Sequence, residues 1–416
     1  MITFEAIDAG HGDAIVVRYM GDMGFERVML IDAGPDSTGS HNGGSYSPLK
    51  TRIIPRLLEI KAERDAKSTD EDITAGDPQL DLDLVVCTHV HDDHIDGVVR
   101  LFTGWTGNGT LPDGGEQIRA PRLWHNSFSR VVQGVDIDAA TVNELERLSI
   151  ADGDNLSVFA SAGNTSVNKG TEDRGNLIAA GHEAASFGPA NIVVLNPGKE
   201  ELENLKKEWA KKSKLVAPGT PLTASGVPAI KEFSEDNSVL NLSSITMLIE
   251  WEKRRILLTG DQRGDFVLRS LEAKGLKTKN KPFHVDILKV PHHGSKANVQ
   301  KKFIAGVTAD IYVFCANGKD QNPDPEVLEI VAGEAAKGRK FTMAFTNGDM
   351  NYVPLDGTLP SFVDGPKKVK TLSAAIAHLK TLPGVAENVN FEFRGAENRL
   401  AVKNEHALIY QLSPTI

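Results

Sequence analysis

The sequence predicts a protein of the α/β class. Short apolar runs typical of buried strands recur along the 416 residues, and several of them end directly in Asp or His. Segments with apolar residues at helical spacing lie between these runs. Hydrophobic residues make up 40% and charged residues 25% of the chain, which is ordinary for a globular protein with a large core.

The same criteria place the individual elements. Residues 1–18 predict a hairpin around the turn Gly10–Asp13. The other predicted strands are Val28–Ile31, Leu82–Cys87, Arg122–Asn126, Asn191–Leu195, Ile245–Trp251, Ile256–Asp261, Val285–Val290, Ile311–Cys315, Phe341–Phe345, Val389–Phe393 and Ala407–Leu412. The predicted helices are Leu49–Asp65, a helix starting at Gly97, Ala139–Ser149, Glu201–Leu215, Glu326–Lys337 and Leu372–Leu382.

One stretch, Thr88–Gly97, carries most of the recognisable chemistry. It follows the apolar run Leu82–Cys87 and places His89, His91, Asp93 and His94 within six residues. Neutral imidazole and carboxylate are the ligands that Zn²⁺ and other first-row metals select. A strand that ends in this cluster therefore predicts a metal site.

This cluster resembles the His-x-His-x-Asp-His signature of the metallo-β-lactamase superfamily. Other segments resemble that superfamily's remaining motifs in the usual order: Leu30–Gly34 before the cluster, and Ile256–Asp261 and Val290–Ser295 after it. The form His-His-Gly-Ser, together with Gly10–Ala14, is similar to the metal-hydrolase domain of ComEC-type competence proteins and their soluble relatives. The resemblance implies a four-layer αβ/βα sandwich over residues 1–350, with insertions at about 103–120, 150–190 and 199–235. Residues 351–416 form a C-terminal extension to which no chemical motif assigns a role.

The resemblance also implies two divalent metal ions, Zn²⁺ or Mn²⁺. His89 and His91 would hold the first ion, and Asp93, His94 and His293 the second, with Asp261 bridging them. The histidine that usually completes the first site has no counterpart here, which leaves Asn241 as the first choice and Asp236 as the second choice for the missing ligand. Asp93 and Asp261 are the expected catalytic residues, because two ions that clamp a hydroxide would provide the nucleophile.

Several residues are expected around the ligands rather than among them. Asp32 and His292 are expected to support the ligand histidines. His11 and Asp13 are expected to line the site, although turn formation alone explains them equally well. Ser295 and Lys296 follow the last histidine motif and are candidates for binding phosphate oxygens.

Composition bounds the function further. A net charge of −10 argues against broad attraction to nucleic acid or anionic membranes, but a phosphate substrate remains compatible because two divalent ions would set the local field. No window approaches a membrane span of ~20 apolar residues, and no signal peptide is recognisable, so a cytoplasmic protein is expected. Cys87 and Cys315 are expected to be buried thiols. The extension is expected to cap the fold or to mediate homo-oligomer formation.

The first function hypothesis is a metal-dependent phosphodiesterase or nuclease acting on a phosphodiester or nucleotide substrate. The second is a lactamase or thioesterase, which keeps the metal centre and changes the bond that is cleaved. The third is a non-catalytic binding protein with a metal-stabilised fold.

Overall fold

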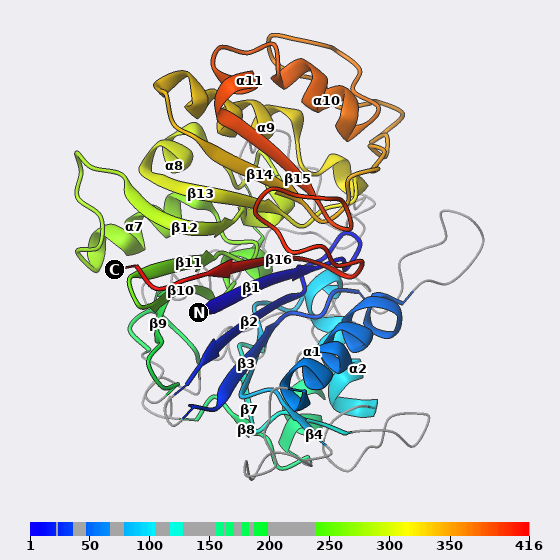
Figure 1. Ribbon diagram of the computed structural model, residues 1–416, viewed down its shortest axis with the longest axis vertical. Coiled ribbons are helices and arrows are strands. Elements are labelled where there is room, and N and C mark those ends of the chain that lie inside the picture. The colour runs from blue at the N-terminus through cyan, green and yellow to red at the C-terminus, as the bar shows by residue number, and fades with distance from the viewer. Residues whose placement is uncertain are drawn as a thin grey trace, which may run out of the picture.

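The computed structural model describes residues 1–21, 24–35, 47–66, 79–104, 117–127, 155–161, 163–169, 177–182, 187–198, 236 and 238–415. The predicted helices Ala139–Ser149 and Glu201–Leu215 lie outside these ranges, as does most of the three predicted insertions. The described part is a mixed α/β structure built around two large sheets (Figure 1).

The first sheet has seven strands in the order β16-β1-β2-β3-β5-β7-β8. Its strands are β1 (Ile2–Ile7), β2 (Ile15–Met20), β3 (Glu26–Ile31), β5 (Leu84–Cys87), β7 (Arg122–His125), β8 (Ser166–Val167) and β16 (Ala407–Leu412). Pairing is antiparallel from β16 to β3 and parallel from β3 to β8.

The second sheet also has seven strands, in the order β15-β14-β13-β12-β11-β10-β9. They are β9 (Asn191–Asn196), β10 (Thr246–Trp251), β11 (Arg254–Leu258), β12 (Phe283–Lys289), β13 (Val307–Phe314), β14 (Phe341–Phe345) and β15 (Val389–Phe393). Pairing is antiparallel from β9 to β11 and parallel from β11 to β15. A separate small sheet pairs β4 (Gln79–Asp81) with β6 (Gln117–Arg119).

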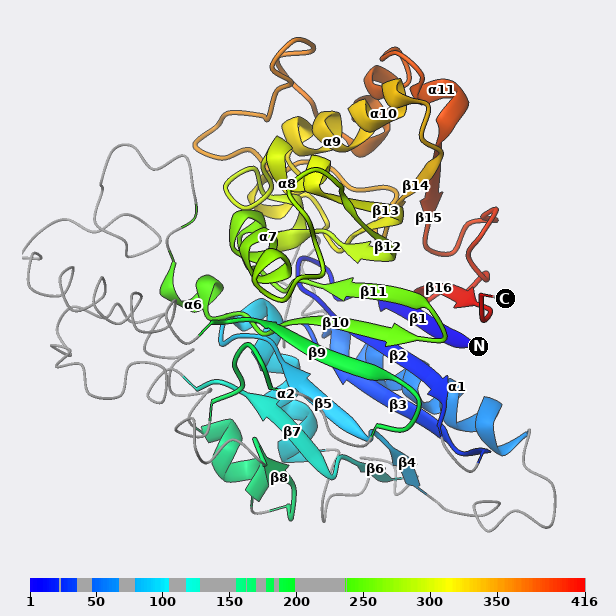
Figure 2. The same cartoon turned by 90° about the vertical axis from the view of Figure 1, so that its left-hand side faces the viewer.

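Alternating side chains divide the core into layers. Phe4 of β1 and Ile256 of β11 belong to one buried cluster between the two sheets. Val16 of β2 points to the other face of the first sheet, and Leu257 of β11 points to the other face of the second. Helices cover both outer faces (Figure 2), so each sheet is buried on both sides over much of its area.

The helices follow from apolar residues at helical spacing. On the first sheet lie α1 (Ile54–Asp65), which a π-helical turn over Leu49–Ile53 precedes, and α2 (Asp92–Gly104). The helices on the second sheet are α7 (Gly264–Ala273), α8 (Lys301–Gly306), α9 (Pro325–Ala332) and α10 (Leu372–Leu379). Two further short helices are α6 (Val239–Leu242) and α11 (Val385–Asn388).

The structure corrects the start of one predicted helix and contains helices that the sequence did not predict. Helix α2 begins at Asp92 rather than Gly97. Carboxylates in the first turn stabilise a helix because they interact with the positive end of its dipole, and Asp92 and Asp93 both lie in that turn. Helices α7 and α8 were not predicted from the sequence. Val267, Leu268 and Leu271 give α7 its buried face, and α8 is only six residues long.

The C-terminal residues contribute strands to both sheets. Strand β15 pairs with β14 at the edge of the second sheet, and β16 pairs with β1 at the edge of the first. The segment predicted to be a C-terminal extension, 351–416, therefore supplies one edge strand to each of the two sheets.

This topology brings chemically active loops to one place. Strands β3, β5, β11 and β12 all run in the parallel parts of the sheets, and Asp32, His89, Asp261 and His292 follow their carboxyl ends. The turn before β2 lies at the same edge, since β2 runs antiparallel to β3. Loops from both sheets thus converge at one edge of the molecule, as ligand sites of open α/β sheets do.

Candidate metal centre

Asp261 lies at the centre of a cluster of histidines. Its Oδ2 is 3.4 Å from His292 Nε2, 3.6 Å from His293 Nε2 and 3.8 Å from His89 Nε2. Its Oδ1 is 3.3 Å from His94 Nε2. The two carboxylate oxygens therefore face different imidazoles, which is the arrangement that a bridging ligand requires.

Each of these imidazoles is held through its other nitrogen. His94 Nδ1 is 2.8 Å from Asp32 Oδ2, and His293 Nδ1 is 2.8 Å from the backbone oxygen of Cys315. Because these acceptors each require a donated hydrogen, the network assigns the proton to Nδ1 and leaves Nε2 directed at Asp261. Orientation of a ligand histidine by a carboxylate or carbonyl is the usual support of a metal site.

His89 and His91 form a second pair of nitrogens. His89 Nε2 lies 3.2 Å from His91 Nδ1, and Thr88 Oγ1 lies 3.2 Å from His89 Nδ1. Burial lowers the pKa values of both histidines, so both are neutral at pH 7. Two neutral imidazoles with converging nitrogens suit a shared cation.

Asp93 and His94 reach the cluster from the first turn of α2. Asp93 Oδ2 lies 3.2 Å from His293 Nε2, and His94 and His293 are buried. Burial alone raises the pKa values of Asp93 and Asp261, but the neighbouring histidines outweigh it and hold both pKa values well below their usual range. Both carboxylates are therefore ionised.

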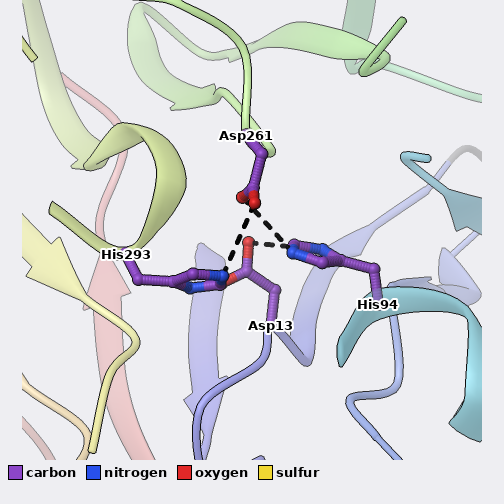
Figure 3. A group of neighbouring side chains, drawn as sticks. All are labelled: Asp13, His94, Asp261 and His293. Carbon is purple, nitrogen blue, oxygen red and sulfur yellow. Dashed lines mark ion pairs between the residues drawn. The ribbon is translucent and has the colours of Figure 1, made fainter. Parts of the chain in front are cut away.

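Asp13 belongs to the cluster itself. Its carboxylate, His94, Asp261 and His293 each offer a ligand atom, and these atoms lie within 4.8 Å of one another (Figure 3). Asp13 Oδ1 is 3.3 Å from His293 Nδ1. The turn reaches this depth because a Cβ on Gly12 would lie 1.9 Å from the backbone oxygen of Asp93, so only glycine allows the approach.

Lys289 is a site residue that the sequence prediction missed. Its side chain is fully buried at the end of β12, and its ammonium donates to the backbone oxygen of Gly260 at 3.0 Å. The same ammonium lies 2.5 Å from Asp13 Oδ2 and 3.7 Å from Asp261 Oδ1. The available signal was a lysine at the end of the predicted strand Val285–Val290, since a lysine is almost never fully buried without a partner.

The donor set fits divalent metal ions. Among the described residues, Asp13 Oδ1, His94 Nε2 and Asp261 Oδ1 are buried without a hydrogen-bond partner, although their three side chains each bring a ligand atom into the same small cluster. Unpaired buried polar atoms are costly unless something compensates them. Imidazole nitrogen and carboxylate oxygen are the ligands that Zn²⁺ and Mn²⁺ accept.

A cavity of about 220 Å³ opens onto the cluster. Asp93, His292 and His293 line it together with polar residues from other loops, which are His11, Ser295, Asn317, Lys319, Asp320 and Asn322. Burial lowers the pKa of His11 to about 4, so this imidazole is neutral, and its Nε2 lies 3.0 Å from the Lys319 ammonium. The cavity thus presents hydrogen-bond donors beside the metal-binding groups.

The structure places the remaining predicted residues at varying distances from the centre. Asp32 contacts His94 directly, and Ser295 lines the cavity. The Lys296 ammonium is 62% exposed and lies 3.6 Å from Glu326 Oε2, so Lys319 rather than Lys296 supplies the lysine beside the cavity. Asn241 and Asp236 bind each other, with Asn241 Nδ2 donating to Asp236 Oδ2 at 2.6 Å.

The backbone at the last histidine motif is unusual. His292 and His293 have φ values of 45° and 55°, and Gly294 follows with a φ of 88°. Non-glycine residues in this left-handed region are uncommon and concentrate at functional sites. The turn directs both neighbouring imidazoles towards Asp261.

Comparisons with known proteins give little guidance. No protein-family model matches the sequence, and a search of curated proteins finds no match. The structure is weakly similar to CmlA, a diiron β-hydroxylase from Streptomyces venezuelae, with a TM-score of 0.32 and 12% identity over 76% of this chain and 45% of CmlA. A protein of unknown function from Enterococcus faecalis gives a TM-score of 0.28 and 11% identity over 96% of this chain and 77% of that protein.

The chain thus spans less than half the length of CmlA, and TM-scores this low carry no argument about function. Among the described residues, no helix combines the length and the apolar character needed to cross a bilayer.

Proposed function

We propose that this protein is a metal-dependent hydrolase that cleaves phosphodiester bonds in a nucleotide or nucleic acid. We also propose a four-layer αβ/βα arrangement of the metallo-β-lactamase type, in the soluble ComEC-like branch. Two facing sheets with helices on their outer faces support this assignment. The placement of every quoted motif at one edge of those sheets supports it further.

One observation carries the proposal. The two oxygens of Asp261 face imidazole nitrogens from two separate stretches of the chain, 89–94 and 292–293, at 3.3 to 3.8 Å. These separations are close to the ~3.4 Å expected between two ligands of one tetrahedral ion with bonds of about 2.1 Å. A cluster that merely stabilised the fold would not need unpaired buried atoms pointing into one volume.

The roles follow from the positions of the groups. His89 and His91 would hold the first Zn²⁺ or Mn²⁺, and Asp93, His94 and His293 the second, with Asp261 shared. When bound, such ions lower the pKa of water from about 15.7 to ~7 and neutralise charge on a phosphoryl group. Asp32 and the Cys315 carbonyl keep the ligand histidines oriented.

The chain's own residues account for substrate binding. Asp93 lines the cavity as an ionised carboxylate and would orient the attacking water as well as hold the second ion. Ser295 and Lys319 line the same cavity and offer a hydroxyl and an ammonium to phosphate oxygens. Such donors favour a phosphodiester over the neutral carbonyl of a lactam or thioester.

Hydrolysis of bis(p-nitrophenyl) phosphate tests the proposal. Metal-free protein should be inactive and should gain activity with Mn²⁺ or Zn²⁺, whereas Asp261→Ala should stay inactive with either ion. His284→Ala is a matched control, because His284 is a half-exposed histidine on the same strand as Lys289. Metal-dependent hydrolysis of nitrocefin or of an acyl-glutathione, without phosphodiesterase activity, would replace the proposal with the lactamase or thioesterase alternative.

A further inference from the structure

The first of the two ion sites has fewer ligands than the second in the assignment above, three against four with the shared Asp261 counted in each. His89, His91 and Asp261 provide three donors, and structural or catalytic zinc sites take three protein ligands or more besides any water. Asp261 is shared with the second ion, so the first site has only two ligands of its own. The neighbouring residues therefore decide whether the site is complete.

The two ligand candidates from the sequence are occupied elsewhere. Asp236 Oδ2 accepts hydrogen bonds from Asn241 Nδ2 at 2.6 Å and from Asn298 Nδ2 at 2.9 Å. The remaining face of that oxygen lies 3.4 Å from His292 Nδ1. Asp236 thus faces the outer side of the His292 ring, with Asn241 behind it.

His292 occupies the position next to Asp261. Its Nε2 lies 3.4 Å from Asp261 Oδ2, the oxygen that His89 Nε2 approaches to 3.8 Å. Its Nδ1 lies 2.8 Å from Asn298 Oδ1. Since Asn298 Nδ2 donates to Asp236 and to the Asp261 backbone oxygen, its Oδ1 is the acceptor, and His292 Nδ1 carries the hydrogen.

The backbone conformation of His292 directs its side chain towards Asp261. Its φ of 45° and ψ of 54° are left-handed, and its N–H donates to the Gly260 oxygen at 3.1 Å while its oxygen accepts from Ser295 N at 2.8 Å. This turn brings His292 and His293 side by side onto the same carboxylate, although neighbouring side chains usually diverge. A strained backbone at a cluster of donors is a mark of function.

We propose that His292 Nε2 is the third ligand of the first ion and that Asp236 and Asn298 position its ring. The inference rests on the proposed metal centre and completes it. The ligand set of the first ion then becomes His89, His91, His292 and the shared Asp261. The carboxylate–histidine arrangement of Asp236 and His292 repeats that of Asp32 and His94 on the second ion.

Metal counting on single variants tests this assignment. The His292→Asn variant is suitable because asparagine tolerates left-handed backbone better than most residues. Titration calorimetry of metal-free protein with Zn²⁺ should show two ions per chain for the natural sequence and one for His292→Asn, as for His91→Ala. The double variant His91→Ala, His292→Asn should still bind one ion, whereas His292→Asn, His293→Ala should lose both.

The positioning residues give a graded result. Asp236→Asn and Asn298→Ala should keep both ions but bind the first about 10- to 100-fold more weakly. His284→Asn, which removes a half-exposed histidine from β12, should bind both ions with unchanged affinity. Circular dichroism on each variant establishes that the chain is folded before titration.

Two outcomes overturn the assignment. His292→Asn that binds two ions with unchanged affinity would remove His292 from the ligand set. Asp236→Asn that loses one ion as completely as His91→Ala, while His292→Asn keeps it, would make Asp236 the ligand instead. These measurements need no substrate, so they test the role of His292 even if the protein has no phosphodiesterase activity. A natural chain that binds no metal would contradict both the proposed function and the assignment of His292.

Discussion

The Lys289 ammonium and the Asp13 carboxylate form a buried ion pair at the metal-binding cluster, with 2.5 Å between Nζ and Oδ2. The two residues come from opposite sheets, since Asp13 precedes β2 and Lys289 ends β12. Burial alone lowers the pKa of Lys289, but Asp13 and Asp261 outweigh it and raise that pKa above its ordinary value. This pair therefore joins the two sheets at the point where the ligands meet.

Replacing Lys289 with methionine should destabilise the metal-free protein. The change leaves the Asp13 carboxylate buried without its partner, and breaking a buried pair in this way costs about 3–5 kcal/mol. Urea unfolding of metal-free protein measures the loss, and the double variant Asp13→Asn, Lys289→Met should recover much of it. A single variant within about 0.5 kcal/mol of the natural chain would show that Asp13 does not depend on Lys289.

A methyl group at Gly12 should disturb the centre without removing any ligand side chain. The new Cβ would meet the backbone oxygen of Asp93 at 1.9 Å, so the two loops must separate, at a cost of about 1–3 kcal/mol. Thermal unfolding should show the loss, and calorimetry should show weaker metal binding. Gly104→Ala is the matched control, because none of the described residues lies within 4 Å of its added Cβ. An equal effect at both positions would show that the close approach of Gly12 to Asp93 is not the cause.

The stability of the metal-free protein should fall as pH rises above neutrality. Burial lowers the pKa of His293, but Asp261 and Asp13 outweigh it and raise that pKa to about 9. A raised folded-state pKa stabilises the fold fully below the unfolded value of ~6.5, and this contribution is lost as pH rises to about 9. Denaturant unfolding between those pH values should show the decline, with a smaller slope in His293→Gln.

Metal reverses the sign of this dependence. Binding requires a deprotonated imidazole nitrogen, so apparent metal affinity should rise with pH over the same range. Titration in two buffers with different heats of ionisation measures the protons released. Zero proton release at pH 7 would contradict a protonated His293 in the metal-free protein.

Asp32→Asn should weaken metal binding without removing a ligand. Asp32 Oδ2 accepts from His94 Nδ1 at 2.8 Å and from Thr88 Oγ1 at 2.6 Å, so an amide in its place can present nitrogen to a donor. The expected loss in affinity for the second ion is about 10- to 100-fold. Asparagine also tolerates the φ of 56° at this position, so the fold should survive. Unchanged metal affinity would show that His94 keeps its orientation without this carboxylate.

Much of the fold was accessible from the sequence because its strands are short apolar runs with period-two or buried patterns. Strands such as β14 and β16 were predicted with the bounds they have. Helix α2 was predicted too late in the chain, since its first turn is made of the very residues that signal a metal site. Residues 351–416 show no motif, and only the strand pairing in the structure reveals that they form an edge strand of each sheet.

The site was accessible only where its ligands share a local motif. His89, His91, Asp93 and His94 fall within six residues, and their spacing is itself the signal. Lys289 and Asp13 meet only because the two sheets pack face to face, which no local pattern encodes. The direction of the His292 side chain depends on a left-handed turn that the neighbouring residues do not predict. Asn241 and Asp236 were therefore the sequence candidates for the third ligand of the first ion.

The central claim is that two bound ions in this cluster make a phosphodiesterase. The most direct measurement is the rate of bis(p-nitrophenyl) phosphate hydrolysis as Mn²⁺ or Zn²⁺ is added stepwise to metal-free protein with bound metal counted at each step. The account predicts that hydrolysis reaches its plateau at two bound ions per chain and is absent from Asp261→Ala. Two bound ions with no hydrolysis, or full hydrolysis in the metal-free protein, would contradict it.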